Sequence, residues 1–445
     1  MIEVLANRIY RHLFLAQVIA LIGTGLLTVA LGLLAFQIAG AEAGAVLGTA
    51  LAIKMIAYVG VAPVAAAFAD RWPRRTMLVA LDLVRTAIAM LLPFVTQVWE
   101  VYILIFVLQS ASAAFTPTFQ ATIPDVLPDE KDYTLALSLS RLAYDLESLV
   151  SPILAATLLT VVSYNNLFVG TAVGFLASAA LVVSVALPSP RPADRGGIYD
   201  RTTRGMRIYL ATPRLRGLLA VNFAVAAAGA MVIVNSVVLV QAKLGLSQQE
   251  TALALAAFGG GSMLAALVLP SLLETIPDRT AILGGASILV AGMFVGPVLA
   301  AQYGALLMLW FILGLGYSIA QTPTGRLLRR SAHPEDRPAV FAAQFALSHA
   351  CWLVTYPLAG WFGAKAGLGP TFIVLGFIAA ISAALAWYVW PAPDLDEIAH
   401  IHTGLSADDA HASGTLRLDD EKKHAHHFVI DKHHGQWPEP GPKRK

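Results

Sequence analysis

The apolar residues of this chain fall into long, nearly continuous runs that are separated by shorter polar segments. A helix needs about 20 mostly apolar residues to cross the hydrocarbon core of a bilayer. Runs of this length predict about twelve membrane-spanning helices, and therefore an all-α membrane protein. The predicted spans are 12–39, 44–69, 76–96, 99–120, 135–162, 166–187, 217–241, 250–273, 280–301, 304–324, 339–364 and 369–391.

A polar, arginine-rich stretch divides these spans into two sets of six. We expect an N-terminal six-helix bundle over 1–187, a linker over 188–216 and a C-terminal six-helix bundle over 217–391. The composition changes again after Pro391, where few apolar residues remain. Such a composition is typical of a disordered segment, so we expect the tail, 392–445, to be largely disordered.

Basic residues are concentrated in every second loop. The loops on one side of the predicted membrane hold only Lys243 and Lys365. The other side has the linker and a larger basic set, namely Arg71, Arg74, Arg75, Lys131, Arg279, Arg326, Arg329, Arg330 and Arg337. Cytoplasmic loops of membrane proteins carry an excess of Lys and Arg. We therefore expect both termini to be cytoplasmic, in a protein that crosses the inner (cytoplasmic) membrane many times.

The composition excludes several classes of protein. Hydrophobic residues make up 57% of the 445 residues and charged residues only 13%, against about 25% charged in soluble domains. A soluble enzyme of this composition could not cover its surface with polar groups. A net charge of +2 argues against a nucleic-acid binder, and the single cysteine, Cys351, excludes an intrachain disulfide.

A short motif follows the second predicted span. The segment Pro63–Arg75 contains Asp70 and Arg71 and ends in Arg74-Arg75. It resembles the signature of the major facilitator superfamily between spans two and three, although Ala66 and Pro73 replace its two glycines. The resemblance implies two pseudo-symmetric six-helix bundles, a substrate site between them near the midplane, and usually a monomer.

The same resemblance implies that Asp70, Arg71, Arg74 and Arg75 latch one conformation, with the carboxylate facing the positive end of a helix in the opposite half. A basic cluster that only orients the protein in the membrane is the alternative. The sequence has no phosphate-binding loop of the glycine-lysine type, so we expect a secondary transporter rather than an ATP-driven pump or an enzyme.

Two helix segments narrow the resemblance. Arg141–Glu147 and Ser348–Pro357, together with a histidine-rich tail, are similar to the nickel-resistance exporters of the NreB type, within the drug and siderophore branch. This likeness implies a secondary active exporter of divalent metal ions, most of all Ni²⁺, with Co²⁺ or Zn²⁺ as further substrates. Metal ligands release protons when they bind a cation, so we expect proton antiport. We expect no resident cofactor.

Charged groups inside a bilayer are costly and indicate functional sites. At 1.5 Å per residue, Asp145 lies roughly 15 Å into the membrane, and four other reactive side chains reach a similar depth. The candidate substrate-binding residues are Lys54, Asp145, Glu147, His349 and Cys351. Carboxylate, imidazole and thiolate ligands from both halves suit Ni²⁺, Co²⁺ or Zn²⁺.

Each of these residues also has a structural interpretation. Asp145 lies four residues after Arg141 and could form an ion pair within its helix. His349 could bond within the bundle, and Cys351 could be a small apolar filler. Lys54 is either a counter-ion that a bound cation displaces or a structural partner of a carboxylate.

The tail contains eight of the 11 histidines. They are His400, His402, His411, His424, His426, His427, His433 and His434. Histidine-rich tracts are a compositional signal for metal binding, and acidic residues lie between these histidines. We therefore expect a metal-capturing tail; an engineered purification tag is the alternative, although tags are usually uninterrupted runs.

Two other functions remain open. The protein could export an organic solute, a drug or siderophore, with Asp145 and Glu147 attracting a cationic drug and the tail acting as a metal-binding regulator. It could also be a metal sensor that signals through its tail without transporting anything. Tolerance to nickel without a change in drug sensitivity would favour the metal exporter.

Overall fold

The computed structural model describes the backbone of most of the chain. It describes residues 2–68, 73–188, 198–273, 275–333 and 336–392. In the tail it describes only short pieces, namely 394, 397–401, 416–419, 423–430, 434 and 437–438. Nearly all of the described residues before the tail are helical.

Six long helices form the N-terminal half. They are α1 (Arg8–Ala39), α2 (Ala43–Phe68), α3 (Arg74–Leu91), α4 (Val98–Val126), α5 (Glu130–Leu158) and α6 (Asn165–Val183). Short 3₁₀ turns, η1 (Ile2–Ala6), η2 (Gly40–Glu42) and η3 (Leu92–Phe94), precede or connect them. The polar residues between the apolar runs supply the caps: the Asn7 side chain accepts hydrogen bonds from the first turn of α1, and Gln97 with Glu100 forms a capping box at α4.

Six more long helices form the C-terminal half. They are α8 (Pro213–Val237), α9 (Gln248–Leu272), α10 (Asp278–Leu299), α11 (Tyr303–Gln321), α13 (Arg337–Pro357) and α15 (Leu368–Val389). Shorter segments extend or join them, namely η4 (Val238–Lys243), α12 (Thr324–Arg329), η5 (Leu358–Phe362) and α14 (Gly363–Ala366). Each of the twelve predicted spans overlaps one long helix, so the predicted all-α fold of two six-helix halves is confirmed.

The helices have the length and composition to cross a membrane. In the described part of the chain, 10 apolar stretches qualify, and the first of them, Arg8–Val61, holds most of both α1 and α2. The α5 helix, which carries Asp145 and Glu147, lies outside these stretches. Large apolar side chains such as Phe377 and Ile381 of α15 are exposed, as expected for groups that face lipid.

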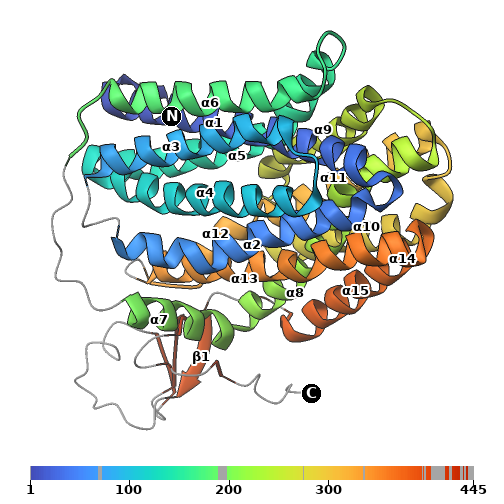
Figure 1. The fold of residues 1–445 in the computed structure, drawn as a ribbon. Coiled ribbons are helices and arrows are strands. Elements are labelled where there is room, and N and C mark those ends of the chain that lie inside the picture. The colour runs from blue at the N-terminus through green and yellow to red at the C-terminus, as the bar shows by residue number, and fades with distance from the viewer. Residues whose placement is uncertain are drawn as a thin grey trace.

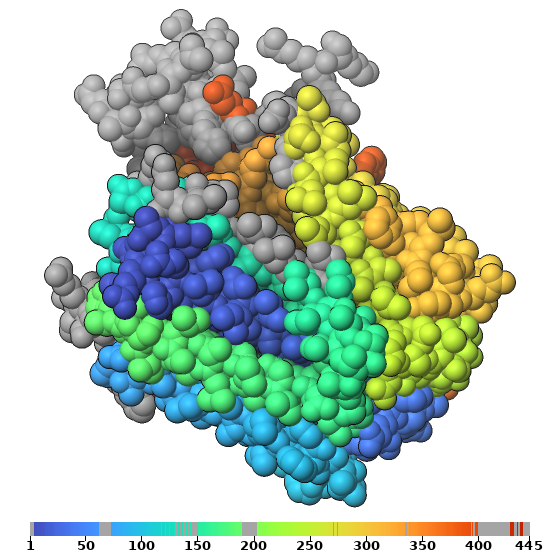
Figure 2. All heavy atoms as spheres, turned by 90° about the horizontal axis from the view of Figure 1, so that it is seen from above, coloured from blue at the N-terminus to red at the C-terminus, as the bar shows by residue number. Residues whose placement is uncertain are grey.

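The two halves lie beside each other (Figures 1 and 2). The N-terminal half runs from blue to green and the C-terminal half from light green through yellow to red-orange, and Figure 2 shows the two halves side by side. Within the halves, α1 packs on α5 and α6, and α9 packs on α11. Between the halves, α2 packs against α13 and α5 against α9, and three of these four helices, α2, α5 and α13, carry candidate site residues.

The linker and the tail contain more structure than the sequence predicted. A helix that we did not predict, α7 (Ile198–Ala211), lies within the linker and packs against α13. The described residues of the tail form an antiparallel sheet of β1 (Glu397–Ile401), β2 (Leu416–Asp419) and β3 (Lys423–His427), in the order β1-β3-β2. Figure 1 draws this sheet below α7.

These strands are order that the sequence did not predict within the tail. The reason is visible directly after β3, where Phe428, Val429 and Ile430 are each less than 5% exposed. Phe428 and Ile430 belong to the same buried apolar cluster as α8 and α13. The burial of three consecutive apolar residues against the bundle holds this segment in place. The average composition of the whole tail is polar and does not reveal them.

Candidate functional site

Three of the candidate charged residues lie close together where the halves meet. Lys54 of α2 interacts electrostatically with Glu147 of α5, and also with His349 of α13. Two of these residues come from the N-terminal half and one from the C-terminal half. When Lys54 is protonated and Glu147 is ionised, their attraction reduces the cost of either charge at membrane depth.

Glu147 is held close to α1. A Cβ atom built on Gly25 of α1 would lie 3.2 Å from Glu147 Oε1 and would collide with Ser151. The Ser151 hydroxyl also donates to the Ile22 carbonyl at 3.4 Å. The absence of a side chain at Gly25 therefore lets α5 approach α1 closely and gives the carboxylate its position.

His349 is held between aromatic rings. Its ring stacks on Tyr58 of α2, with 5.4 Å between ring centres and 3° between planes, and lies 4.0 Å from the Phe345 ring. Lys54 Nζ lies 5.8 Å from the centre of the Tyr58 ring, within cation–π range. The site therefore combines one cation, one carboxylate and a group of stacked rings.

The hydrogen bond of His349 fixes its tautomer. Nδ1 lies 2.6 Å from the Phe345 carbonyl oxygen. A carbonyl can only accept, so Nδ1 carries a proton, and Nε2 is the nitrogen left to bind a ligand or accept a proton.

The aromatic residues of this site were not predicted from the sequence. Tyr58 follows Lys54 by four residues, Phe345 precedes His349 by four, and Tyr144 precedes Glu147 by three. Side chains at these spacings share one helix face, so the spacing was the signal that could have found them. Tyr144 interacts electrostatically with Tyr58 and with Glu147.

Cys351 lies apart from the other candidates. It is 3% exposed, and its Sγ donates to the Leu347 carbonyl at 3.3 Å. It lies near Tyr209 of α7, whose hydroxyl donates a hydrogen bond to Gln344. Burial raises the pKa of Tyr209, and the nearby Cys351 raises it further by a smaller amount. Two residues along a helix are about 200° apart, so Cys351 lies on the opposite face from His349. The expected pairing of imidazole and thiol is not formed.

The structure describes only part of the predicted latch, and it does not describe the Asp145 side chain. The side chains of Arg141 and Asp145 lie outside the described side chains, and so do Asp70 and Arg71. Arg74 and Arg75 are described: Arg74 is buried and forms an ion pair with Asp125 at the end of α4, and Arg75 donates to the Val183 carbonyl at the end of α6. These bonds of the two arginines stay within the N-terminal half.

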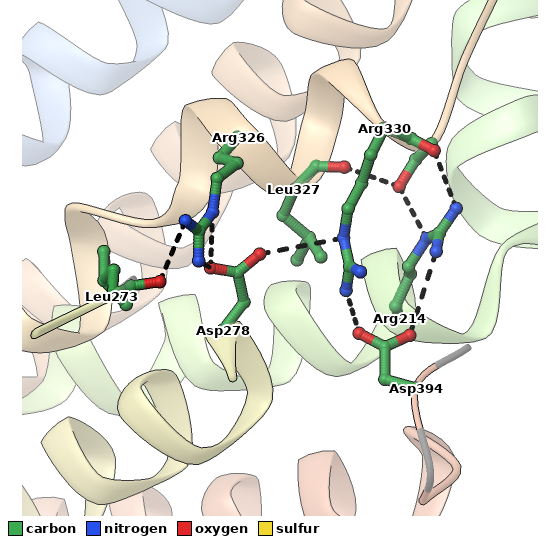
Figure 3. Close-up of polar contacts among 8 residues, drawn as sticks. Arg214, Leu273, Asp278, Arg326, Leu327, Arg330 and Asp394 are labelled. Atoms are coloured by element: carbon green, nitrogen blue, oxygen red, sulfur yellow. Dashed lines mark hydrogen bonds and ion pairs between the residues drawn. The ribbon is translucent and has the colours of Figure 1, made fainter. Parts of the chain in front are cut away.

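The C-terminal half has a similar ion pair at the corresponding place (Figure 3). Asp278, at the start of α10, pairs with Arg326 of α12 and lies 3.7 Å from Arg330. In the N-terminal half the arginine begins the third span and the aspartate ends the fourth. In the C-terminal half the aspartate begins the third span, and the arginine follows the fourth.

A second buried ion pair lies within the N-terminal half. Asp82 and Arg85, three residues apart on α3, form the local pair that their spacing suggests. The Ser178 hydroxyl donates to Asp82 at 2.7 Å, and the Arg85 guanidinium lies 4.2 Å and 4.4 Å from the ring centres of Phe115 and Phe175. The pair is thus held by contacts within one half, although the buried Nε atom of Arg85 has no hydrogen-bond partner among the described residues.

The halves approach most closely at one end of the interface. A Cβ atom on Gly48 of α2 would lie 2.5 Å from the Tyr356 carbonyl oxygen, and one on Gly360 of η5 would collide with the Gly44 carbonyl. Trp361 Nε1 also donates to Thr49 at 2.8 Å. Following the predicted orientation, we name this end, at the start of α2 and the end of α13, the outer end, and the opposite end the inner end.

The structure places the tail histidines only in part. His400, His424, His426 and His427 lie in the strands, and His400 is the register partner of His424, but their side chains lie outside the described ones. His402, His411 and His433 lie outside the described residues altogether.

His434 is the tail histidine whose side chain is described. It is 5% exposed, and its ring lies 4.5 Å from Phe428, which in turn lies 5.0 Å from Trp437. Among the described residues, no three His, Cys, Asp or Glu side chains come together as metal ligands.

Comparison with known proteins identifies the family. The family model of the Major Facilitator Superfamily matches residues 13–233 and 218–406, so the chain belongs to this superfamily of membrane transporters. It is 23% identical over 350 residues to YfiS of Bacillus subtilis, an uncharacterised transporter of the same type, and this match covers 73% of the chain and 81% of that protein.

A further relative and two solved structures extend the comparison. Macrolide efflux protein A of Streptococcus pyogenes is 26% identical over 152 residues, which is 32% of this chain and 37% of that protein. A bacterial homologue of the human lysosomal transporter Spinster, in an inward-facing and unoccupied conformation, matches with a TM-score of 0.69 at 13% identity, over 86% of this chain and 96% of its own. The nucleoside transporter NupG matches with a TM-score of 0.64 at 12% identity, over 86% and 98%.

Proposed function

We propose that this transporter exports a lipophilic organic cation, and that Lys54, Tyr58, Glu147 and His349 form its substrate and coupling site. The observation that carries the proposal is the combination of one carboxylate with stacked rings at the interface. Glu147 offers a charge partner for a cation, and Tyr58, Phe345 and His349 offer flat apolar surfaces. The macrolide efflux relative points to the same class of substrate.

Proton antiport follows from the chemistry of Glu147 and Lys54. A cation that binds Glu147 takes the place of Lys54 or of a proton on the carboxylate. A proton that arrives from the outer side neutralises Glu147 and releases the cation there. The same carboxylate thus binds either the substrate or a proton, which is the requirement for exchange.

Alternating access completes the proposed mechanism. The close contacts at Gly48 and Gly360 shut the outer end, and the ion pairs of the inner end lie within each half. We infer an inward-facing carrier in the inner membrane, with both termini in the cytoplasm and a single chain as the working unit. Rocking of the halves would open the outer end and carry the substrate out.

Export of a divalent metal ion, Ni²⁺ before Co²⁺ or Zn²⁺, is the second candidate. His349 Nε2 and the Glu147 carboxylate are suitable ligands, and the histidine-rich tail would collect the ion on the cytoplasmic side. The position of Lys54 beside both ligands and the position of Cys351 on the other face of α13 weigh against this candidate.

Transport into inside-out vesicles separates the two candidates. Ethidium and Ni²⁺ uptake are each measured with and without an imposed pH gradient. The proposal predicts ethidium uptake that depends on the gradient and little uptake of Ni²⁺. Gradient-driven Ni²⁺ uptake without ethidium uptake would favour the metal exporter, and uptake that ignores the gradient would reject antiport.

A further inference from the structure

A strongly basic pocket lies at the inner end of the C-terminal half, away from the proposed substrate site. Its volume is about 490 Å³, and it lies between α12, the start of α13 and the tail. Its lining consists of Arg326, Arg329, Arg330, His333 and Arg337, with Ala332 and Val429.

Among the described residues, the arginines of the pocket outnumber the acidic groups that form ion pairs with them. Asp278 and Asp394 pair with Arg326 and Arg330. Among the residues that the structure describes, no acidic group lies within ion-pair distance of Arg329 or Arg337. The Nε atom of Arg337 is buried and has no hydrogen-bond acceptor in the described part of the chain. A buried donor without an acceptor is costly, so this atom indicates a place for an acceptor from outside the protein.

The pocket has a fixed frame (Figure 3). Arg214 is 1% exposed and donates to Ser331 at 2.9 Å and to the Arg330 carbonyl at 2.8 Å. Asp394 pairs with Arg330 and lies 3.8 Å from Arg214. These bonds hold the segment that carries the pocket arginines in place before any ligand arrives, which reduces the ordering cost of binding.

We propose that this pocket binds a phosphate group, carried either by the headgroup of an anionic phospholipid or by a soluble phosphate compound. Guanidinium groups match phosphate oxygens with paired hydrogen bonds, and basic pockets at the ends of membrane helices suit lipid headgroups. Val429 of the tail forms part of the wall, so an occupied pocket ties the tail to the C-terminal half.

Thermal unfolding of the full-length protein in a neutral detergent tests this proposal. The Tm is titrated with sodium phosphate, with dihexanoyl phosphatidylglycerol and with dihexanoyl phosphatidylcholine, at an ionic strength kept constant with NaCl. We expect a saturable rise in Tm with phosphate or phosphatidylglycerol. In the Arg329→Gln/Arg337→Gln variant the half-saturating concentration should rise at least about tenfold, because two charge-assisted contacts are lost.

Two variants keep the result clear. Arg216→Gln removes an exposed arginine of α8 that lies outside the pocket lining, and should titrate like the wild type. Arg329→Glu changes only an exposed pocket residue, so it keeps the test valid if the double variant does not fold.

The arms of the titration distinguish the two sources. Stabilisation by phosphatidylglycerol alone assigns a lipid headgroup, and equal stabilisation by inorganic phosphate assigns a soluble compound; either result supports the site. The proposal is overturned if no additive gives a saturable rise. It is also overturned if the rise is the same in Arg329→Gln/Arg337→Gln or Arg329→Glu as in the wild type.

Discussion

The outer and inner ends of this transporter are held together in different ways. At the outer end, backbone meets backbone across the two halves, because Gly44, Gly48 and Gly360 carry no side chain to separate them. At the inner end, ion pairs such as Arg74–Asp125 and Asp278–Arg326 connect helices of the same half. Contacts that cross the interface must break for the outer end to open, whereas contacts within a half can persist throughout the cycle.

This difference separates the parts of the molecule that move relative to one another from those that stay rigid. The proposed substrate site lies between the two ends and combines Lys54 and Glu147 of one half with His349 of the other. Mutations at the outer end should therefore block the cycle, mutations at the site should change coupling or substrate choice, and mutations within one half should have small effects on transport.

The largest effect is expected from Gly360→Val. A branched side chain at this position would collide with the Gly44 carbonyl and keep the outer end from closing. We predict at least a tenfold loss of transport in vesicles, with normal insertion and folding. Gly284→Val is the matched control, because nothing lies within 4 Å of a Cβ at Gly284. Wild-type transport by Gly360→Val would show that this contact is not a gate.

Glu147→Gln should come next. Glutamine keeps the shape of the side chain but can neither attract a cation nor exchange a proton, so we predict at least a tenfold loss of transport driven by a pH gradient. Glu42→Gln, an exposed residue of η2, should transport normally. The measurement is uptake into vesicles with and without the gradient, and equal losses in both variants would contradict the assignment.

His349→Phe sharpens the choice between substrates. Phenylalanine preserves a ring that can stack on Tyr58 but removes Nε2. For an organic cation we predict transport within about threefold of wild type in His349→Phe and a larger loss in His349→Ala. For Ni²⁺ both variants should lose transport equally, so the ratio of the two rates is the informative number.

The smallest effect is expected from Cys351→Ala. The thiol lies near Tyr209 of α7, on the face of α13 opposite to His349 of the proposed substrate site, so transport should change less than twofold. Removing the thiol of a buried cysteine costs some packing, and a small drop in Tm is expected. A loss of transport as large as that of Glu147→Gln would contradict this placement and show that Cys351 is part of the substrate site.

The sequence predicted the helices well because a bilayer imposes a simple rule on length and polarity. It also predicted that Lys54, Glu147 and His349 would lie near one another, because depth along a helix follows from the residue count. Depth does not give the face of the helix, which is why Cys351 was grouped with His349. The aromatic residues were missed because apolar rings in a membrane helix look like packing residues.

The linker helix and the tail sheet were missed for a different reason. Both lie in polar segments, and their order depends on contacts with the bundle rather than on local composition. Tyr209 of α7 is buried beside α13, and Phe428 packs into the core of the C-terminal half. Such contacts join positions far apart in the chain, and no window of neighbouring residues contains them.

The central claim is that Glu147 binds either the exported cation or a proton. Calorimetric titration of the purified protein with the substrate that the vesicle assay selects, in two buffers of different ionisation enthalpy, counts the protons released on binding. The account predicts proton release from the wild type and from Glu42→Gln, and weak binding without release from Glu147→Gln. Undiminished binding and proton release in Glu147→Gln would contradict it.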